Sequence, residues 1–192
     1  NNILIATDDS QLIKNAIRYT ANTFPEANYH ILNVINVSNK SVPKTEMLMK
    51  DLKEAARRAI DDSKEILEEM GISKIKPVVK EGVPSERILA YIEQHHIDML
   101  VMGTQSKSGT QTLEIGDTCL HTLENSSIPI LLFGSLVDIK RPKKIFNPTS
   151  GSKYSMEASY LAVELAEYLN GEIGVMCIKG GDKEQSTLRR IS

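Results

Sequence analysis

Short apolar runs alternate with longer amphipathic segments through the first part of the chain, and this alternation restricts the fold more than any other feature. The apolar runs predict strands at residues 3–7, 30–37, 75–79, 99–102 and 130–133. Between them, apolar residues recur at helical spacing over residues 12–20, 43–70, 84–95 and 115–125. Strands that are almost continuously apolar are typical of a parallel sheet covered by helices on both faces. We therefore expect an α/β fold.

The segment from Asp98 to Thr118 predicts a site for an anion. An apolar strand ends there at Gly103, and a loop rich in small residues leads to Gly116 at the start of a helix. Such a loop presents backbone N–H groups to a phosphate. Two residues oppose this use, because Asp117 places a carboxylate beside the phosphate position and Ser106 carries a side chain where glycine allows the closest approach.

Composition excludes several functional classes. With 192 residues, a formal charge of −2 and a pI near 6.1, the chain has no basic field for nucleic acid. No apolar run approaches the roughly 20 residues that cross a bilayer, and the N-terminus lacks the layout of a secretory signal. We expect a cytoplasmic protein with no membrane span.

Cys119 and Cys177 have no partner at metal-ligand spacing, so both are expected to be buried, reduced thiols.

A partial repeat follows the fifth strand. Residues 137–144 are polar and basic and predict a linker, and Lys144–Ser152 then echoes Asn2–Ser10. A helix at 156–169 and a strand at 172–178 continue the repeat, which stops there. We expect one complete domain at residues 1–138, and a linker plus a partial second domain of the form β-α-β at 139–192. A unit of this size leaves much of its sheet uncovered.

Four motifs resemble the universal stress protein family. They are the opening Ile3-Leu-Ile-Ala-Thr-Asp-Asp-Ser10, Gly82-Val-Pro-Ser-Glu-Arg-Ile-Leu89, Asp98-Met-Leu-Val-Met-Gly103 and Pro129-Ile-Leu-Leu-Phe133. Residues 2–134 resemble a full domain of that family, and 143–178 the start of another. The expected fold is an open parallel sheet of strand order 3-2-1-4-5, like that of the adenine nucleotide alpha hydrolases. Its strands should bury these residues: Ile3, Ile5, Leu32, Val34, Val78, Leu100 and Ile130.

The resemblance also implies a binding pocket. Nucleotide-binding members of the family carry two glycines three residues apart, then a third glycine followed by Ser or Thr, and this frame falls on Gly103, Ser106, Gly116 and Asp117. By resemblance, Asp8 would lie at the ribose and Val34 at the adenine, with Met102, Gly103, Gly116 and Thr118 lining the pocket. ATP or AMP would be the ligand, its binding weakened by Ser106 and Asp117. The second copy has Ser150 in place of Asp8 and should bind nucleotide more weakly.

Asp8 and Asp9 also allow a purely structural interpretation, as a turn and cap before the first helix. No histidine has a neighbour that makes it a convincing general base, and no nucleophile elbow surrounds the serines of the loop. The favoured function is a regulatory module of the universal stress class that responds to nucleotide or to protein partners, and we expect no enzyme activity. The alternatives are a nucleotide-using enzyme of the same superfamily and a soluble regulatory domain of a larger protein such as a transporter.

Assembly is expected to involve the fifth strand. Ile130, Leu131, Leu132 and Phe133 form an edge with no charge to discourage pairing. In the resembled family this strand pairs across a two-fold axis with its counterpart, which implies a homodimer.

Overall fold

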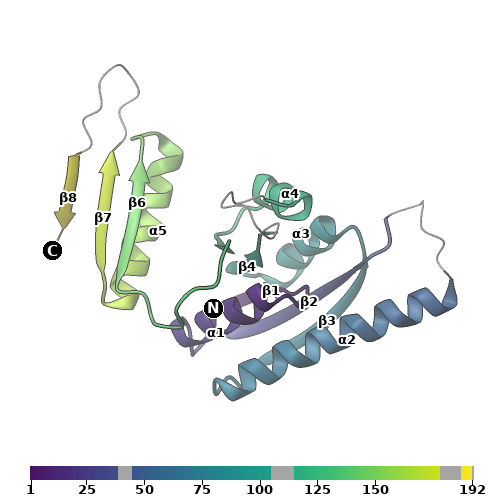
Figure 1. Ribbon diagram of the computed structural model, residues 1–192. Coiled ribbons are helices and arrows are strands. Elements are labelled where there is room, and N and C mark those ends of the chain that lie inside the picture. The colour runs from purple at the N-terminus through teal and green to yellow at the C-terminus, as the bar shows by residue number, and fades with distance from the viewer. Residues whose placement is uncertain (39–44, 105–114, 178–186, 192) are drawn as a thin grey trace. The chain divides into compact units, whose positions relative to one another are not determined.

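The computed structural model describes residues 1–38, 45–104, 115–177 and 187–191, the last of these as backbone (Figure 1). The chain divides into two compact units, Asn1–Ile139 and Lys140–Ser192. Each unit has its own sheet, and each is described by itself below.

The first unit contains a parallel sheet of five strands in the order β3-β2-β1-β4-β5. Every neighbouring pair of strands is parallel, which confirms the predicted fold class and strand order. The strands are β1 (Asn2–Ala6), β2 (Asn28–Asn36), β3 (Ile75–Gly82), β4 (Met99–Gly103) and β5 (Ile130–Phe133). Because the chain passes from β1 to β2 on one side and returns to β4 on the other, the strand order reverses between β1 and β4.

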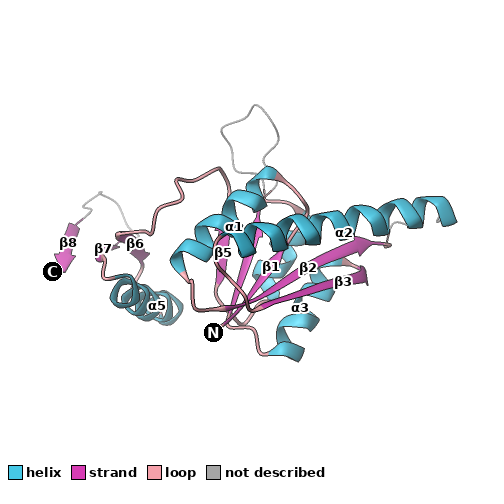
Figure 2. Ribbon diagram, turned by 90° about the horizontal axis from the view of Figure 1, so that it is seen from below, coloured by secondary structure: helices cyan, strands magenta, loops and turns pink. Residues whose placement is uncertain are grey.

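Helices cover both faces of this sheet. The helices are α1 (Gln11–Thr23), α2 (Glu46–Glu69), α3 (Pro84–His95) and α4 (Asp117–Asn125). Figure 2 shows α1 and α2 on one face and α3 on the other. Cys119 of α4 belongs to the same buried cluster as the residues of α3, so α4 shares the face of α3.

Local sequence signals set the ends of these helices. Ser10 caps α1 by accepting a hydrogen bond from the backbone N–H of Ile13 at 3.3 Å. Gly71 closes α2 with a φ of 82°, and its backbone N–H donates to the carbonyl of Glu68. The N–H of Ile72 donates to Leu67, which completes a Schellman motif. Gly71 is therefore the C′ residue of α2.

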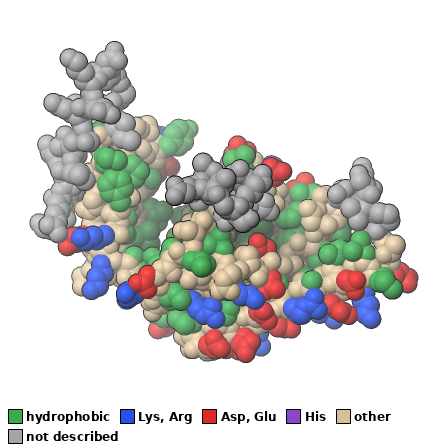
Figure 3. Space-filling view, viewed as in Figure 1, with side chains coloured by type: hydrophobic (Ala, Val, Ile, Leu, Met, Phe, Trp, Pro, Cys, Tyr) green, Lys and Arg blue, Asp and Glu red, His purple; other side chains and the backbone are tan. Residues whose placement is uncertain are grey.

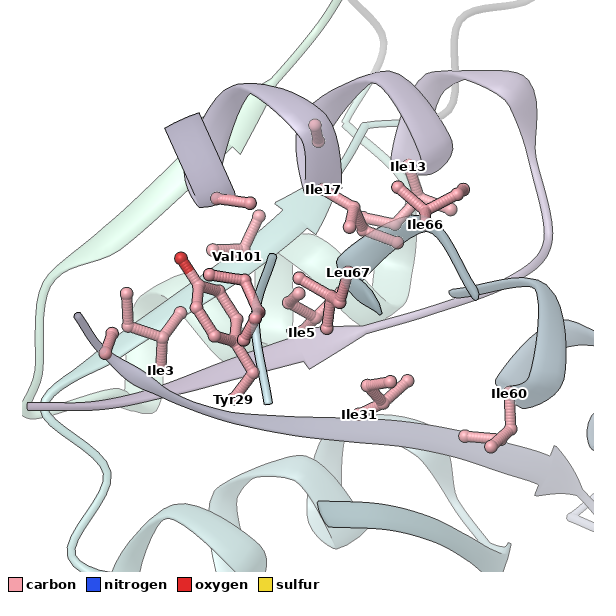
Figure 4. Packing of buried hydrophobic residues seen from close by; sticks show 14 of the residues in the cluster. Ile3, Ile5, Ile13, Ile17, Tyr29, Ile31, Ile60, Ile66, Leu67 and Val101 are labelled. Carbon is pink, nitrogen blue, oxygen red and sulfur yellow. The ribbon is translucent and has the colours of Figure 1, made fainter. Parts of the chain in front are cut away.

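Two apolar clusters hold the first unit together, one on each face of the sheet. The larger cluster lies between the sheet and the helices α1 and α2, where the side chains of alternate strand residues meet those of the helices (Figure 4). The smaller one lies under α3 and α4 and contains Leu4, Leu32 and Leu100. Each fully buried Ile or Leu contributes roughly 1.5–3 kcal/mol to folding. The two clusters therefore hold the strands, including their carboxyl ends, in fixed positions.

Four of the residues predicted to be buried, Ile3, Ile5, Leu32 and Leu100, are buried. The prediction was wrong for the other three, Val34, Val78 and Ile130, which are only partly buried. Val78 and Ile130 belong to the two edge strands, where one flank has no neighbouring strand. Val34 is partly exposed because it lines a pocket, described below.

The second unit is a smaller layer of one helix on one sheet. It contains β6 (Lys144–Thr149), α5 (Lys153–Leu169), β7 (Glu172–Cys177) and β8 (Thr187–Ile191). The strands β6 and β7 are parallel, and β8 is an additional strand that pairs antiparallel with β7 and that the sequence did not predict. Among the side chains that the structure describes, the buried cluster beneath α5 consists of Ala162, Ala166 and Ile173. Cys177, expected to be buried, is exposed at the end of β7.

Charged side chains of both signs are interspersed along α2 (Figure 3). Two pairs within the helix, Lys50–Glu54 and Lys64–Glu68, have the i,i+4 spacing of a solvated helix surface. Within the described part of the chain, no helix is long and apolar enough to cross a membrane.

Candidate functional site

A pocket of about 350 Å³ opens at the carboxyl ends of β1, β2 and β4, on the face covered by α3 and α4. Open parallel sheets bind ligands at this place, where the strand order reverses. Its volume lies in the range of roughly 300–1,000 Å³ that is usual for small-ligand sites. The lining residues are Ala6, Thr7, Asp8, Leu32, Asn33, Val34, Pro84, Ile88, Met102, Gly103, Gly116, Asp117, Thr118 and Cys119.

One wall of the pocket is apolar. Leu32 and Val34 come from one face of β2, Met102 from the end of β4, and Pro84 and Ile88 from the first turns of α3. Leu32, Ile88 and Met102 are held in the buried cluster under α3, so this wall is rigid. A rigid apolar wall suits a flat aromatic ring, because the ring loses its hydration on contact and needs no side-chain rearrangement.

Asp8 supplies a carboxylate at the rim. It follows β1 directly and is exposed, and its Oδ1 accepts a hydrogen bond from the backbone N–H of Ser10 at 3.0 Å. Among the described residues, its Oδ2 has no hydrogen-bond partner. Asp9 turns away from this position, and its Oδ1 lies 2.7 Å from the Nζ of Lys14. Asp8 therefore serves the turn, as the structural interpretation expects, and still offers an oxygen to a ligand hydroxyl.

The N-terminus of α4 forms the opposite wall. Gly116 is the N-cap residue, and it makes no side-chain capping bond. Within the described part of the chain, the first backbone N–H groups of the helix, at Asp117, Thr118 and Cys119, have no hydrogen-bond partner. They are therefore available to an anion, and the helix dipole favours negative charge there. The side chain of Asp117 sits at the first helical position and itself satisfies part of this preference for negative charge.

The fold brings seven of the eight predicted site residues to this one pocket. They are Asp8, Val34, Met102, Gly103, Gly116, Asp117 and Thr118. The eighth, Ser106, lies outside the described residues, so its predicted place in the phosphate loop remains a prediction.

Sequence reasoning did not assign Asn33, Pro84, Ile88 or Cys119 to the pocket. The motif from Gly82 to Leu89 could have indicated Pro84 and Ile88, because proline commonly occupies the first turn of a helix and here starts α3 at the pocket. Asn33 is held by its side-chain amide, which donates to the carbonyl of Thr7 at 2.8 Å. Nothing in the sequence pairs Asn33 with Thr7, since their contact depends on the register of two strands.

The only thiol in the pocket wall, that of Cys119, is not activated. Burial raises the pKa of Cys119, so the neutral thiol is favoured. Among the described residues, no three His, Cys, Asp or Glu side chains are grouped so that they could hold a metal ion.

A second hollow, of about 310 Å³, lies on the α2 side of the same strand ends. It shares Asp8, Asn33 and Val34 with the first pocket. It is otherwise bounded by Asp9, by the end of β2 and by α2, which contributes small residues such as Ala55 and Ala59. The shared residues form the partition between the two hollows.

Comparison with known proteins places this site in a family. The model of the universal stress protein family matches residues 1–134. Universal stress protein MJ0531 of Methanocaldococcus jannaschii is 30% identical over 148 residues, which cover 74% of this chain and 83% of that protein.

Solved structures agree with this match. A universal stress protein from Archaeoglobus fulgidus superposes with a TM-score of 0.78 and 18% identity, covering 96% of this chain and 68% of that one. A universal stress family protein of Arabidopsis thaliana, solved with AMP bound, has a TM-score of 0.52 and 16% identity, covering 69% of this chain and 90% of that one. At these identities the two structures support the fold alone. The sequence matches support more: the chain belongs to the universal stress protein family.

Proposed function

We propose that the first unit is a regulatory module that binds an adenine nucleotide in the pocket at the ends of β1, β2 and β4. The observation that carries the proposal is the pairing of an apolar wall with the free oxygen of Asp8 and the uncapped N-terminus of α4. The adenine ring would pack against Val34, and a ribose hydroxyl would donate a hydrogen bond to Asp8. A phosphate would accept hydrogen bonds from the backbone N–H groups at the N-terminus of α4. The AMP-bound protein of the same family supports this choice of ligand.

AMP should bind better than ATP. The phosphates of ATP carry more negative charge than that of AMP, and Asp117 places a carboxylate at the helix end that receives them. At a separation of about 6 Å and an effective dielectric constant between 20 and 80, like unit charges repel by roughly 0.7–3 kcal/mol. This repulsion weakens ATP binding more than AMP binding, because the longer phosphate chain of ATP carries more negative charge.

The pocket supports binding rather than chemistry. Its described lining has no histidine or lysine, its thiol is kept neutral by burial, and its two carboxylates lie at the turn before α1 and at the start of α4. A nucleotide-using enzyme would need an activating group at the phosphate. Incubation with ATP and chromatography of the products would detect hydrolysis, and turnover at an enzymatic rate would overturn the regulatory assignment.

Isothermal calorimetry with AMP tests the binding proposal, using Asp8→Asn and, as its matched control, Asp9→Asn. The first change removes the charge at the pocket rim, and we expect a roughly tenfold loss of AMP affinity, as for a charge-assisted hydrogen bond. The second removes the charge that faces Lys14 and should leave AMP binding within about twofold of wild type. Absence of AMP binding by the wild-type chain would refute the nucleotide proposal.

The second unit is proposed to be a partial second copy of the first. The register of β6 and β7 begins at Lys144 opposite Glu172, as that of β1 and β2 begins at Asn2 opposite Asn28. Thr7 directly follows the first strand of the first unit, and Thr149 ends the first strand of the second. The Oγ1 of each threonine accepts from the backbone N–H two residues later, at 3.4 Å in the first unit and 3.3 Å in the second. Ser150 occupies the place of Asp8, so this unit lacks the rim carboxylate.

The chain is also proposed to form a homodimer through β5. This strand is an edge of the five-stranded sheet, and three of its four residues are only partly buried. Exposed apolar side chains lie on α4 and just beyond β5, at Leu120, Leu123, Leu136 and Val137. Pairing two copies through this edge would cover them. Regulation by a protein partner fits the same surface.

A further inference from the structure

Three ring side chains gather on the α3 face of the sheet, at the end opposite the pocket. The Nδ1 of His30 on β2 lies 2.9 Å from the hydroxyl of Tyr91 on α3. The rings of Tyr91 and His95 are tilted by 44° to each other, with their centroids 4.1 Å apart. The Nζ of Lys76 on β3 lies 3.5 Å from the Nδ1 of His95. A lysine ammonium can only donate, so this arrangement requires a neutral His95 whose Nδ1 accepts.

Lys80 extends this group along β3. Lys76 and Lys80 are four residues apart in a strand, so both side chains point to the same face, together with Val78, which packs on the cluster under α3. His95 and His96 lie at the end of α3. We call the group of Lys76, Lys80, His95 and His96 the basic strip.

The basic strip has no acidic counterpart in the described part of the chain. No carboxylate lies within ion-pair distance of Lys76 or Lys80, whereas Lys53 reaches Glu81 at 3.1 Å and Lys64 reaches Glu68 at 3.3 Å. The pKa of His95 is lowered by loss of hydration and then by the positive charges of Lys76, Lys80 and His96. All charged groups that act on His95 are therefore positive. Such a cluster repels itself in a chain whose net charge is −2.

We infer that the basic strip is a docking surface for an acidic peptide segment of a partner protein, and that acidification tightens this contact. Carboxylates of the partner would remove the repulsion among the four residues and would allow His95 to take up a proton. Because the protonated form binds better, a fall in pH through the titration of His95 increases affinity.

An acidic peptide fits the strip better than nucleic acid does. Bases stack on exposed aromatic rings, and the phenol ring of the cluster, that of Tyr91, is buried. The strip also lacks the long basic field that attracts a phosphate backbone. The peptide would dock through side chains, since Pro77 within β3 and the lysines of this edge discourage the pairing of another strand.

Fluorescence anisotropy with a labelled peptide of alternating Glu and Ser tests the inference, with a Gln-Ser peptide of the same length as the probe control. About twelve residues suffice, because an extended chain of that length exceeds the roughly 13 Å between residues four apart in a strand. The protein variants are Lys76→Gln/Lys80→Gln together and His95→Gln. The matched control is Lys64→Gln, which removes a lysine of the same unit that is already paired.

Wild type should bind the Glu-Ser peptide at pH 7.5 and should bind it roughly threefold more tightly at pH 6, where glutamate is still ionised. The double lysine variant should lose roughly tenfold in affinity, the value expected from two exposed ion pairs. His95→Gln should keep binding at pH 7.5 and lose the gain at pH 6. Lys64→Gln should behave as wild type, and thermal unfolding would verify that each variant is folded.

Three results would overturn the inference. The first is that the wild-type protein binds the Glu-Ser and Gln-Ser peptides with equal affinity. The second is that the double lysine variant binds the Glu-Ser peptide as tightly as wild type does and self-associates in light scattering. The lysines would then serve only to prevent pairing at the sheet edge. The third is tighter binding of a labelled single-stranded oligonucleotide that depends on the same lysines, which would identify a nucleic-acid surface instead.

Discussion

Asp9 and Gly151 hold the same left-handed backbone conformation, with φ of 64° and 78°, at the same step of two strand-to-helix turns. Asp9 follows the end of β1 by three residues and Gly151 follows the end of β6 by two, and each directly precedes the serine that caps the next helix, Ser10 or Ser152. Glycine takes this conformation without strain, and aspartate is among the few other residues that tolerate it.

Gly151→Ala should destabilise the second unit by about 1–2 kcal/mol, the usual cost of a left-handed conformation for a residue with a Cβ. No neighbouring atom lies within 4 Å of the added Cβ, so the cost comes from the backbone alone. Asp9→Asn, the control, keeps a residue that tolerates the conformation. Urea unfolding monitored separately for each unit measures both changes, and an unchanged midpoint for Gly151→Ala would contradict the assigned turn.

Backbone amides of the second unit should exchange with solvent faster than those of the first. The cluster beneath α5 contains three buried residues, and Phe146 is 56% exposed whereas Leu4, its equivalent in the repeat, is fully buried. Local opening of β6 and β7 therefore costs less than opening of β1 and β4. Hydrogen exchange with mass spectrometry compares the two sets of peptides. Equal protection would mean that the open face of the second unit is covered in solution.

The stability of the first unit should fall as the pH drops below about 6.5, the usual pKa of an exposed histidine. The pKa of His30 is lowered in the folded protein by burial and then by Lys76 and His95. The unfolded chain therefore binds the proton more readily, and the contribution of His30 is present above that pH and is lost as the pH falls toward its folded pKa.

His30→Gln should flatten this dependence, because glutamine does not titrate. Thermal unfolding between pH 8 and pH 5 gives the curve for each protein. His121→Gln serves as the control, since it replaces an exposed histidine of the same unit. A parallel decline of wild type and His30→Gln would contradict the prediction.

Asp117→Ser should strengthen ATP binding more than AMP binding. Removing the carboxylate at the first position of α4 relieves repulsion of roughly 1 kcal/mol, about a fivefold change in Kd. Adding Ser106→Gly should strengthen ATP binding further if this residue approaches the phosphates as the family motif implies. Calorimetry with both nucleotides measures the ratio. Tight ATP binding by the unmodified chain would show that Asp117 does not act on the phosphates.

Leu131→Lys should weaken the proposed dimer, which light scattering at micromolar concentration detects as a loss of mass. Leu131 is partly buried and packs on the core, so the substitution also threatens the fold. Leu136→Lys avoids this difficulty, because Leu136 is 62% exposed. Met47→Lys, at a residue 76% exposed on α2, is the matched control. A wild type that is monomeric in the same experiment would rule the dimer out.

The sequence by itself determined the fold of the first unit. The alternation of apolar runs and amphipathic segments depends on contacts between residues close in the chain, and so do the cap at Ser10 and the C-terminal glycine of α2, Gly71. These signals are local, so they can be read without knowing which strands are neighbours. The strand order came from the resemblance of four motifs to one family.

Tertiary structure decided which residues meet. Asn33 reaches Thr7 only because β2 lies beside β1 in one register, and Pro84 and Ile88 reach the pocket only because α3 packs over Leu32. The basic strip depends in the same way on His30 facing Lys76 across two strands, with α3 above them. The residues that meet in these places are far apart in the chain, and no periodicity records such a distance. The partial exposure of Val34 had the same origin, since a strand pattern indicates an apolar face and the packing of α3 and α4 leaves part of that face open as a pocket.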